Sequence, residues 1–447
     1  MLITARLNFL KMIKNTLILL SCIMLMSCKP YKPFENNQKP PETTKPIIEQ
    51  TWKIENGKFY LDGKWKFLKI GKWLINFADA GGVDQMIAGL GQLKAKNYDV
   101  IELNCYWHHF DSDGDGNIDV SLTPLNKVIN AILAKNMIPS LSVETYSVGG
   151  GFMPSGFWNL FPDAYAINDK GQKVKDTEYQ VGSDVVSIFH SGYRAAAHKF
   201  IKNLARGIDT KKILWFETTV EPQYMGVINL DYSEAARTEY NKWLTANNIT
   251  DPASQMPATF PIPQTFVNNA NWNKFRAQFL AKWVNEDAKA YREVAGANAY
   301  VAVDYLDAEE STMRNRMGDP QEFLNSLTEA NIIQVNWSWY FPTNTPNNKA
   351  YQRVKKANTD YNRNWVITEH MTFNGSDFDH YSDAVLNDIL MNTLRQGTGF
   401  GWEFVSVGNV TASYFSMYNN DWSPKRVMRY VDGNWNTLMQ KVEEIAK

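Results

Sequence analysis

The stretch WFETTVEPQY, residues 215–224, carries two glutamates in an apolar, β-prone run. Side chains alternate in direction along an extended chain, so Glu217 and Glu221 share one face. Pro222 has no N–H for a sheet ladder and therefore marks the end of the strand. This places Glu221 at the strand's end, where chemistry is accessible, and predicts Glu217 as a deeper, buried structural carboxylate.

A third glutamate, Glu369, stands near the end of a second β-prone run, WVITEHM. Two carboxylates facing each other across one site suit glycoside hydrolysis, because one protonates the leaving oxygen while the other attacks the anomeric carbon or activates water. A single glutamate at a strand end is more often an ion-pair partner. The pair of Glu221 and Glu369 therefore carries the hypothesis.

Eight β-prone runs alternate with helical patterns and supply the elements that position these glutamates. The predicted strands are residues 66–75, 98–107, 137–146, 211–222, 299–306, 331–340, 364–371 and 399–407. Continuous apolar runs of this kind are typical of parallel strands that are buried on both faces. The count of eight predicts a single-domain (β/α)8 TIM barrel with long loops after strands 3 and 4. The two glutamates then end strands 4 and 7 on the C-terminal face, where barrel active sites are built.

The stretch FETTVEP, with a glutamate ending strand 4 and another ending strand 7, resembles the clan A retaining glycoside hydrolases, in particular the family 5 cellulases and mannanases. Residues 153–194, which begin MPSGFWNLFPDAY, are similar to the family 42 β-galactosidases between their third and fourth strands. The resemblance implies that Glu221 is the acid/base and Glu369 the nucleophile. Val220 departs from the pattern, because most of the clan carries an Asn there that holds the sugar 2-hydroxyl.

The resemblance also implies contacts with sugar. Trp402 on strand 8 matches the tryptophan that forms the floor of the −1 subsite, and strand 6 is expected to supply an aromatic residue beside the nucleophile, from Trp337, Trp339 or Tyr340. Strand 2 lacks the arginine common in family 5 and offers Glu102 and Asn104 instead, of which Asn104 is the expected sugar contact.

Three further features allow both a functional and a structural interpretation. His109 follows strand 2 and either donates to a sugar hydroxyl or packs at the rim. Tyr146 follows strand 3 and either stacks on a sugar face or belongs to the core. The acidic run after strand 5, beginning at Asp304, is expected to be a solvated loop rather than a sugar contact.

The stretch DSDGDGNID places three carboxylates at the first, third and fifth positions of an EF-hand-type calcium loop, with a fourth at the ninth. These residues are Asp111, Asp113, Asp115 and Asp119. Leu122 stands where a bidentate glutamate belongs, and a solvated turn is the alternative. We expect a structural calcium ion that clamps a loop, with no cofactor required for catalysis.

The N-terminus has basic residues followed by an apolar run too short to span a bilayer, which is typical of a signal peptide. Its end, LMSC, resembles the bacterial lipoprotein box, which implies cleavage before Cys28 and lipidation of that residue; a short uncleaved anchor is the alternative. The predicted organisation is a signal peptide (1–27), a Pro-rich tether (28–50) and a catalytic domain (51–447). The expected location is the cell envelope, on the periplasmic or cell-surface face of the outer membrane.

Composition restricts the partners. The formal net charge of −1 gives no reason to expect nucleic acid, and the membrane is expected to be reached through the lipid anchor only. The leading hypothesis is a lipid-anchored retaining β-glycosidase that acts on an oligo- or polysaccharide through two glutamates. The alternative is a glycan-binding lipoprotein that keeps the barrel without catalysis, and Val220 is the feature that supports it.

Overall fold

The structure is a computed structural model that describes residues 51–225, 229–306, 310–336, 348–372, 382–396, 400–408 and 416–446. The predicted signal peptide, the tether with Cys28, and the aromatic residues Trp337 and Trp339 lie outside the described residues. Within the described ranges, no helix combines the length and the apolar character that crossing a bilayer requires.

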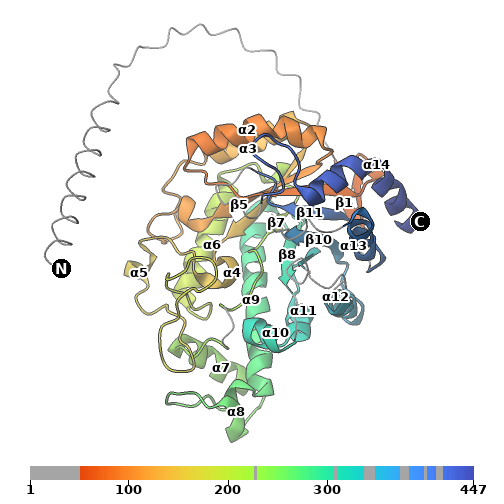
Figure 1. Cartoon of the computed structure of the whole chain (residues 1–447). Helices are drawn as coiled ribbons and strands as arrows, with labels where there is room; N and C mark the ends of the chain where they lie inside the picture. The colour runs from red at the N-terminus through yellow and green to blue at the C-terminus, as the bar shows by residue number, and fades with distance from the viewer. Residues whose placement is uncertain are drawn as a thin grey trace, which may run out of the picture. The chain divides into compact units, whose positions relative to one another are not determined.

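Eight parallel strands close into a barrel, which confirms the predicted (β/α)8 fold (Figure 1). Each strand lies within one predicted run, except that the seventh extends one residue beyond its run: β4 (Leu68–Trp73), β5 (Val100–Tyr106), β6 (Ile138–Glu144), β7 (Phe216–Glu217), β8 (Val301–Leu306), β9 (Ile332–Asn336), β10 (Val366–Thr372) and β11 (Gly401–Val405). Strand β7 is the shortest, and the chain leaves the sheet four residues before Glu221.

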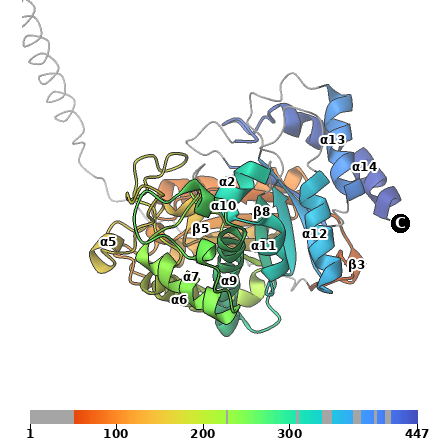
Figure 2. The same ribbon diagram turned by 90° about the horizontal axis from the view of Figure 1, so that it is seen from below.

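Helices surround the barrel, and Figure 2 shows α6, α9, α11 and α12 around the strands. The helices between strands or after the last one are α2 (Ala80–Ala95), α3 (Thr123–Ala134), α6 (Ser191–Arg206), α9 (Ala270–Ala295), α10 (Glu310–Met317), α11 (Pro320–Ser326), α12 (Asn348–Asp360), α13 (Asp383–Gln396) and α14 (Arg426–Ala446). The long segment after β6 contains α4 (Ser147–Gly150) and α5 (Phe157–Leu160), and that after β7 contains α7 (Glu234–Ala246) and α8 (Gln264–Val267). Both long loops were predicted.

A small antiparallel sheet precedes the barrel, formed by β1 (Trp52–Glu55), β2 (Lys58–Leu61) and β3 (Lys64–Trp65). Asp62 and Gly63 connect β2 to β3, and both have positive φ, as the tight hairpin turn requires. Phe59 of β2 packs with the apolar residues that fill the N-terminal end of the barrel, such as Leu68 and Phe400. The sheet therefore closes the end of the barrel opposite to Glu221.

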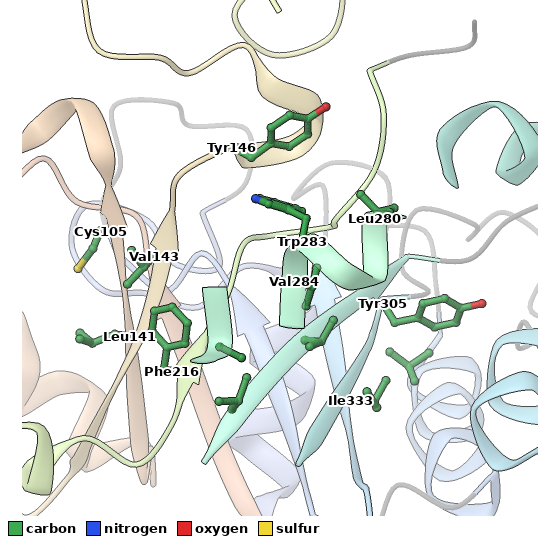
Figure 3. Packing of buried hydrophobic residues seen from close by; sticks show 14 of the residues in the cluster. Cys105, Leu141, Val143, Tyr146, Phe216, Leu280, Trp283, Val284, Tyr305 and Ile333 are labelled. Atoms are coloured by element: carbon green, nitrogen blue, oxygen red, sulfur yellow. The ribbon is translucent and has the colours of Figure 1, made fainter. Parts of the chain in front are cut away.

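The two faces of the barrel strands differ in character. The outward face packs against the helices in one continuous apolar cluster, and Figure 3 shows Leu141, Phe216 and Ile333 from the strands facing Trp283 and Val284 of α9. The inward face is apolar at the N-terminal end of the strands. Toward the C-terminal end it becomes polar and charged. The polar part of the interior is where the predicted site lies.

Candidate active site

A lysine lies at the centre of the polar interior. Lys72 Nζ of β4 is 2.8 Å from Glu102 Oε1 of β5 and 2.8 Å from Glu217 Oε2 of β7, and all three residues are almost completely buried. Burial alone would raise the pKa of Glu102, but attraction to Lys72 and several hydrogen bonds lower it to about 2. Burial and repulsion from Glu102 raise the pKa of Glu217 well above its usual range. The pKa values of the two carboxyl groups beside Lys72 are therefore shifted in opposite directions, and the prediction that Glu217 is buried is confirmed.

Glu403 of β11 completes this group. Gln334 Nε2 donates to Glu403 Oε2 at 2.6 Å, and burial, followed by repulsion from Glu102, raises the pKa of Glu403 well above its usual range. The carboxylate oxygens of Glu102, Glu217 and Glu403 lie within 4.8 Å of one another, a spacing that would suit a metal ion. The ammonium group of Lys72 already supplies the positive charge among them.

Glu221 lies beyond the end of β7, on the C-terminal side of this layer. It is buried and has a φ of +47°, the left-handed region that non-glycine residues rarely adopt. Asn336 Nδ2 donates to Glu221 Oε1 at 2.6 Å, and Gln223 Nε2 donates to Oε2 at 3.0 Å. A non-glycine residue in this conformation costs on the order of 1 kcal/mol and persists where the surroundings hold it, which is common at active sites. The geometry fixes the carboxylate of Glu221 in one orientation.

Asp304 of β8 is a second acidic group beside Glu221. Its side chain is completely buried, and burial, followed by repulsion from Glu221, raises its pKa well above the usual range. The expectation that Asp304 belongs to a solvated acidic loop was therefore wrong. The available signal was its position inside the apolar run VAVDYL, where a charge marks an inward-facing position.

Glu144, at the end of β6, was not selected from the sequence. Its Oε2 accepts from Thr219 Oγ1 at 2.9 Å and from the backbone N–H of Val220 at 3.2 Å. Its Oε1 accepts from Ser142 Oγ at 2.7 Å and from Asn104 Nδ2 at 3.2 Å. Asn104 was predicted as a sugar contact, and the structure places it in the polar interior with its amide on Glu144.

Glu369 lies in β10, in register with Val335 of β9 and Trp402 of β11. Val335 and Trp402 both belong to the outer apolar cluster, whereas the preceding Thr368 is in register with the inward-facing Gln334. The side chain of Glu369 lies outside the described residues, so its role as nucleophile stays a prediction.

Trp402 and Tyr146 do not form sugar platforms. Trp402 is completely buried in the outer layer, with ring centroids 4.9 Å from Phe67 and 6.3 Å from Trp435, because its neighbour Glu403 takes the inward position. Tyr146 begins the segment after β6 and is buried, with its ring centroid 5.1 Å from that of Trp283 of α9. Figure 3 shows the two side chains next to each other. The prediction that Trp402 contacts sugar was wrong, and of the two alternatives for Tyr146 the structure supports the core.

His109 lies in a short 3-10 helix, η1 (Trp107–His109), directly after β5. Burial, followed by repulsion from His108, lowers the pKa of His109 to about 4, so the ring is neutral near neutral pH. Among the residues that the structure describes, its Nδ1 has no hydrogen-bond partner. A neutral imidazole with a free nitrogen is suited to a ligand hydroxyl, and the prediction for His109 remains open.

In the aspartate loop after β5, three of the four predicted calcium ligands lie close together. Carboxylate oxygens of Asp111, Asp113 and Asp115 lie within 4.8 Å of one another. Asp111 also accepts from the backbone N–H groups of Gly114 and Gly116, both at 2.7 Å. Asp119 instead accepts from the N–H and Oγ of Ser112, at 2.9 and 2.7 Å, so it closes the turn. Calcium binding by this loop stays a prediction.

Comparisons with known proteins match this geometry at the level of the fold. No protein-family model matches the chain, and no curated protein does. Among solved structures, the catalytic domain of a β-amylase from Paenibacillus polymyxa superposes with a TM-score of 0.61 and 14% identity, over 85% of this chain and 99% of that one.

Two β-galactosidases superpose comparably. The enzyme from a Rahnella species gives a TM-score of 0.61 at 10% identity over 85% of this chain, and that from the psychrophilic Marinomonas ef1 gives 0.59 at 9% over 86%. The matches cover 57% and 62% of these two enzymes, so this chain corresponds to less than two thirds of their length. At these identities the likeness shows that the chain shares the barrel of glycoside hydrolases.

Proposed function

We propose that this protein is a glycoside hydrolase with Glu221 as its proton donor. The observation that carries the proposal is the state of Glu221: buried, left-handed, and held by Asn336 and Gln223 just beyond the fourth barrel strand. The solved structures that share the fold, a β-amylase and two β-galactosidases, all act on sugars by their names and support this substrate class.

The finer proposal is a retaining β-glycosidase. Glu369 attacks the anomeric carbon while Glu221 protonates the leaving oxygen, and Glu221 then deprotonates the water that releases the sugar. Asn104 and His109 contact sugar hydroxyls, with Trp337 or Trp339 as the aromatic contact. The substrate is an oligo- or polysaccharide. We also propose that the protein is held in the cell envelope by lipid on Cys28. Replacing Cys28 by Ala is expected to move the protein from the membrane to the soluble fraction.

The first experiment tests Glu221. The full chain in detergent is assayed on a panel of aryl glycosides and polysaccharides, and Glu221→Gln is compared on the substrate found. Loss of general acid catalysis is expected to lower kcat/KM by about 10²- to 10⁴-fold for a poor leaving group, and much less for a 2,4-dinitrophenyl glycoside, which needs no proton. Glu234→Gln, an exposed position on α7, is the matched control. Activity of Glu221→Gln near wild type on the poor leaving group would remove the assignment.

One observation favours a second candidate, a glycan-binding protein without catalysis. The backbone register places Glu369 among residues whose side chains pack outside the barrel. In this case the chain binds oligosaccharides without turning over any member of the panel, and Glu369→Ala binds them unchanged. If instead Glu369→Ala abolishes hydrolysis and azide restores it as a glycosyl azide, the retaining mechanism is supported.

A further inference from the structure

The carboxylate of Glu144 accepts hydrogen bonds from four donors in the polar interior of the barrel. Its carboxylate is completely buried at the end of β6 and accepts from Ser142, Asn104, Thr219 and Val220. Buried carboxylates are expensive unless such donors compensate for lost hydration. The four donors make Glu144 a fixed acceptor between β5, β6 and the segment after β7.

The donors on the segment after β7 immediately precede Glu221. Strand β7 ends at Glu217, and the backbone N–H of Thr218 still reaches Ala302 O of β8 at 3.3 Å. The next two residues are held by the carboxylate of Glu144, through Thr219 Oγ1 and the backbone N–H of Val220. Beyond the last backbone hydrogen bond of the sheet, the chain is therefore held by hydrogen bonds to the carboxylate of Glu144.

We propose that Glu144 is a positioning residue that holds Thr219 and Val220 so that Glu221 leaves the strand in its left-handed conformation with its carboxylate in the barrel mouth. This inference rests on the proposed function of Glu221. It also gives position 220 a different task, because the backbone N–H of Val220, rather than its side chain, makes the contact with Glu144. The valine side chain is compatible with that task.

Three variants of Glu144 test whether the position of its acceptor atoms or the charge of its carboxylate matters. Glu144→Ala leaves Val220 N–H without its acceptor, and Glu144→Asp keeps the charge on a side chain one carbon too short to reach it. Glu144→Gln keeps an acceptor at the right distance, while the hydroxyl of Ser142 and the amide of Asn104 can turn to accept from the new amide. Misplacing a catalytic group by about 1 Å costs on the order of 10²-fold in rate. We therefore expect kcat/KM to fall about 100-fold in Glu144→Ala and Glu144→Asp, and about 10-fold or less in Glu144→Gln.

The leaving-group dependence distinguishes positioning from general damage. If Glu144 acts through the proton donor, the loss in Glu144→Ala shrinks for the 2,4-dinitrophenyl glycoside, as it does in Glu221→Gln. A defect of the same size for both leaving groups would overturn the inference, as would a Glu144→Asp variant more active than Glu144→Gln. Thr219→Val removes one donor alone, and its effect is expected to be largely absent when Glu144 is already Ala, because the two residues share one contact.

A crystal structure of Glu144→Gln and of Glu144→Ala gives a readout that needs no activity. The expected result is that Glu221 keeps its positive φ in the Gln variant and loses it in the Ala variant; an unmoved Glu221 in the Ala variant overturns the inference even if the protein hydrolyses nothing. Should Glu144→Ala fail to fold, Glu144→Asp gives the same comparison. Conversely, a fully active Glu221→Gln removes the proposed function and leaves the geometric role of Glu144 standing.

Discussion

The two ends of the barrel interior contrast sharply, although the same strands build both. The N-terminal end is filled by apolar side chains, among them Leu68, Val100, Ile138, Ile332, Val366 and Phe400. The C-terminal half holds Lys72, Glu102, Glu217, Asp304, Gln334 and Glu403, all buried. Burial of apolar surface stabilises the first end at roughly 25 cal/mol per Å². At the second end Lys72 lies between Glu102 and Glu217 and offsets part of their charge, while burial raises the pKa of Glu217 and Glu403.

The largest effect is expected from breaking the charged half. Lys72→Met removes the buried cation and leaves Glu102 ionised without a partner, which costs about 3–5 kcal/mol when one member of a buried pair is deleted. The free energy of unfolding, measured by urea denaturation, should fall by this amount at about pH 8. The loss should be smaller at about pH 5, where Glu102 protonates more readily without its lysine. A small, pH-independent loss would show that Lys72 does not control this layer.

The apolar end provides the matched comparison. Ile332→Ala removes a buried side chain packed beneath the polar layer and is expected to cost about 3 kcal/mol through lost burial and a cavity. Nothing titratable changes, so the loss in unfolding free energy should be the same at about pH 5 and pH 8. A loss that varies with pH would mean that the two ends are coupled, contrary to the contrast drawn above.

A third change tests the other division, between the inward and outward faces of β11. Trp402→Phe shortens a side chain that packs on Phe67 and Trp435 in the outer layer, with an expected cost of about 1–2 kcal/mol. Because Trp402 is outside the barrel, KM and kcat on the substrate found should stay near wild type. A rise in KM with unchanged stability would instead indicate that Trp402 contacts the substrate.

The same division explains what sequence reasoning could supply. The eight strands were predictable because each is a β-prone run between helical patterns. The burial of Glu217 was predicted correctly from its place inside such a run, although the strand ends at Glu217 and not at Pro222 as predicted. Trp402 was misassigned because both faces of a barrel strand are buried, so apolar character cannot identify the inward face. A lone charge does so: Glu403 and Asp304 lie inside otherwise apolar strands and point inward.

Glu144 and the conformation of Glu221 lay beyond such patterns. Glu144 sits in the run IPSLSVE, where its four donors come from three separate segments that only the closed barrel brings together. The carboxylate of Glu221, whose φ is positive, accepts from Asn336, more than a hundred residues away, as well as from its neighbour Gln223. Local sequence indicates secondary-structure propensity. These features depend on tertiary contacts, so local patterns did not predict them.

The smallest predicted effect concerns the protons held in the charged half. Burial, followed by repulsion from Glu102, raises the pKa of Glu403 above its unfolded value, so the folded protein keeps this proton over a pH range in which the unfolded chain releases it. Stability from this group is therefore complete below the unfolded pKa of about 4.3 and declines as pH rises toward the folded pKa.

Glu403→Gln imitates the protonated form and cannot titrate, while its amide can still accept from Gln334 and donate to Glu102. We expect the variant to unfold with nearly wild-type free energy at about pH 4. Its stability should fall less steeply than that of the wild type up to about pH 8, by at most one proton per molecule in the slope. Ile332→Ala, which leaves Glu403 in place, should retain the wild-type slope. Parallel wild-type and Glu403→Gln curves would mean that Glu403 is ionised in the folded protein, and the charged half would then need a second cation beside Lys72.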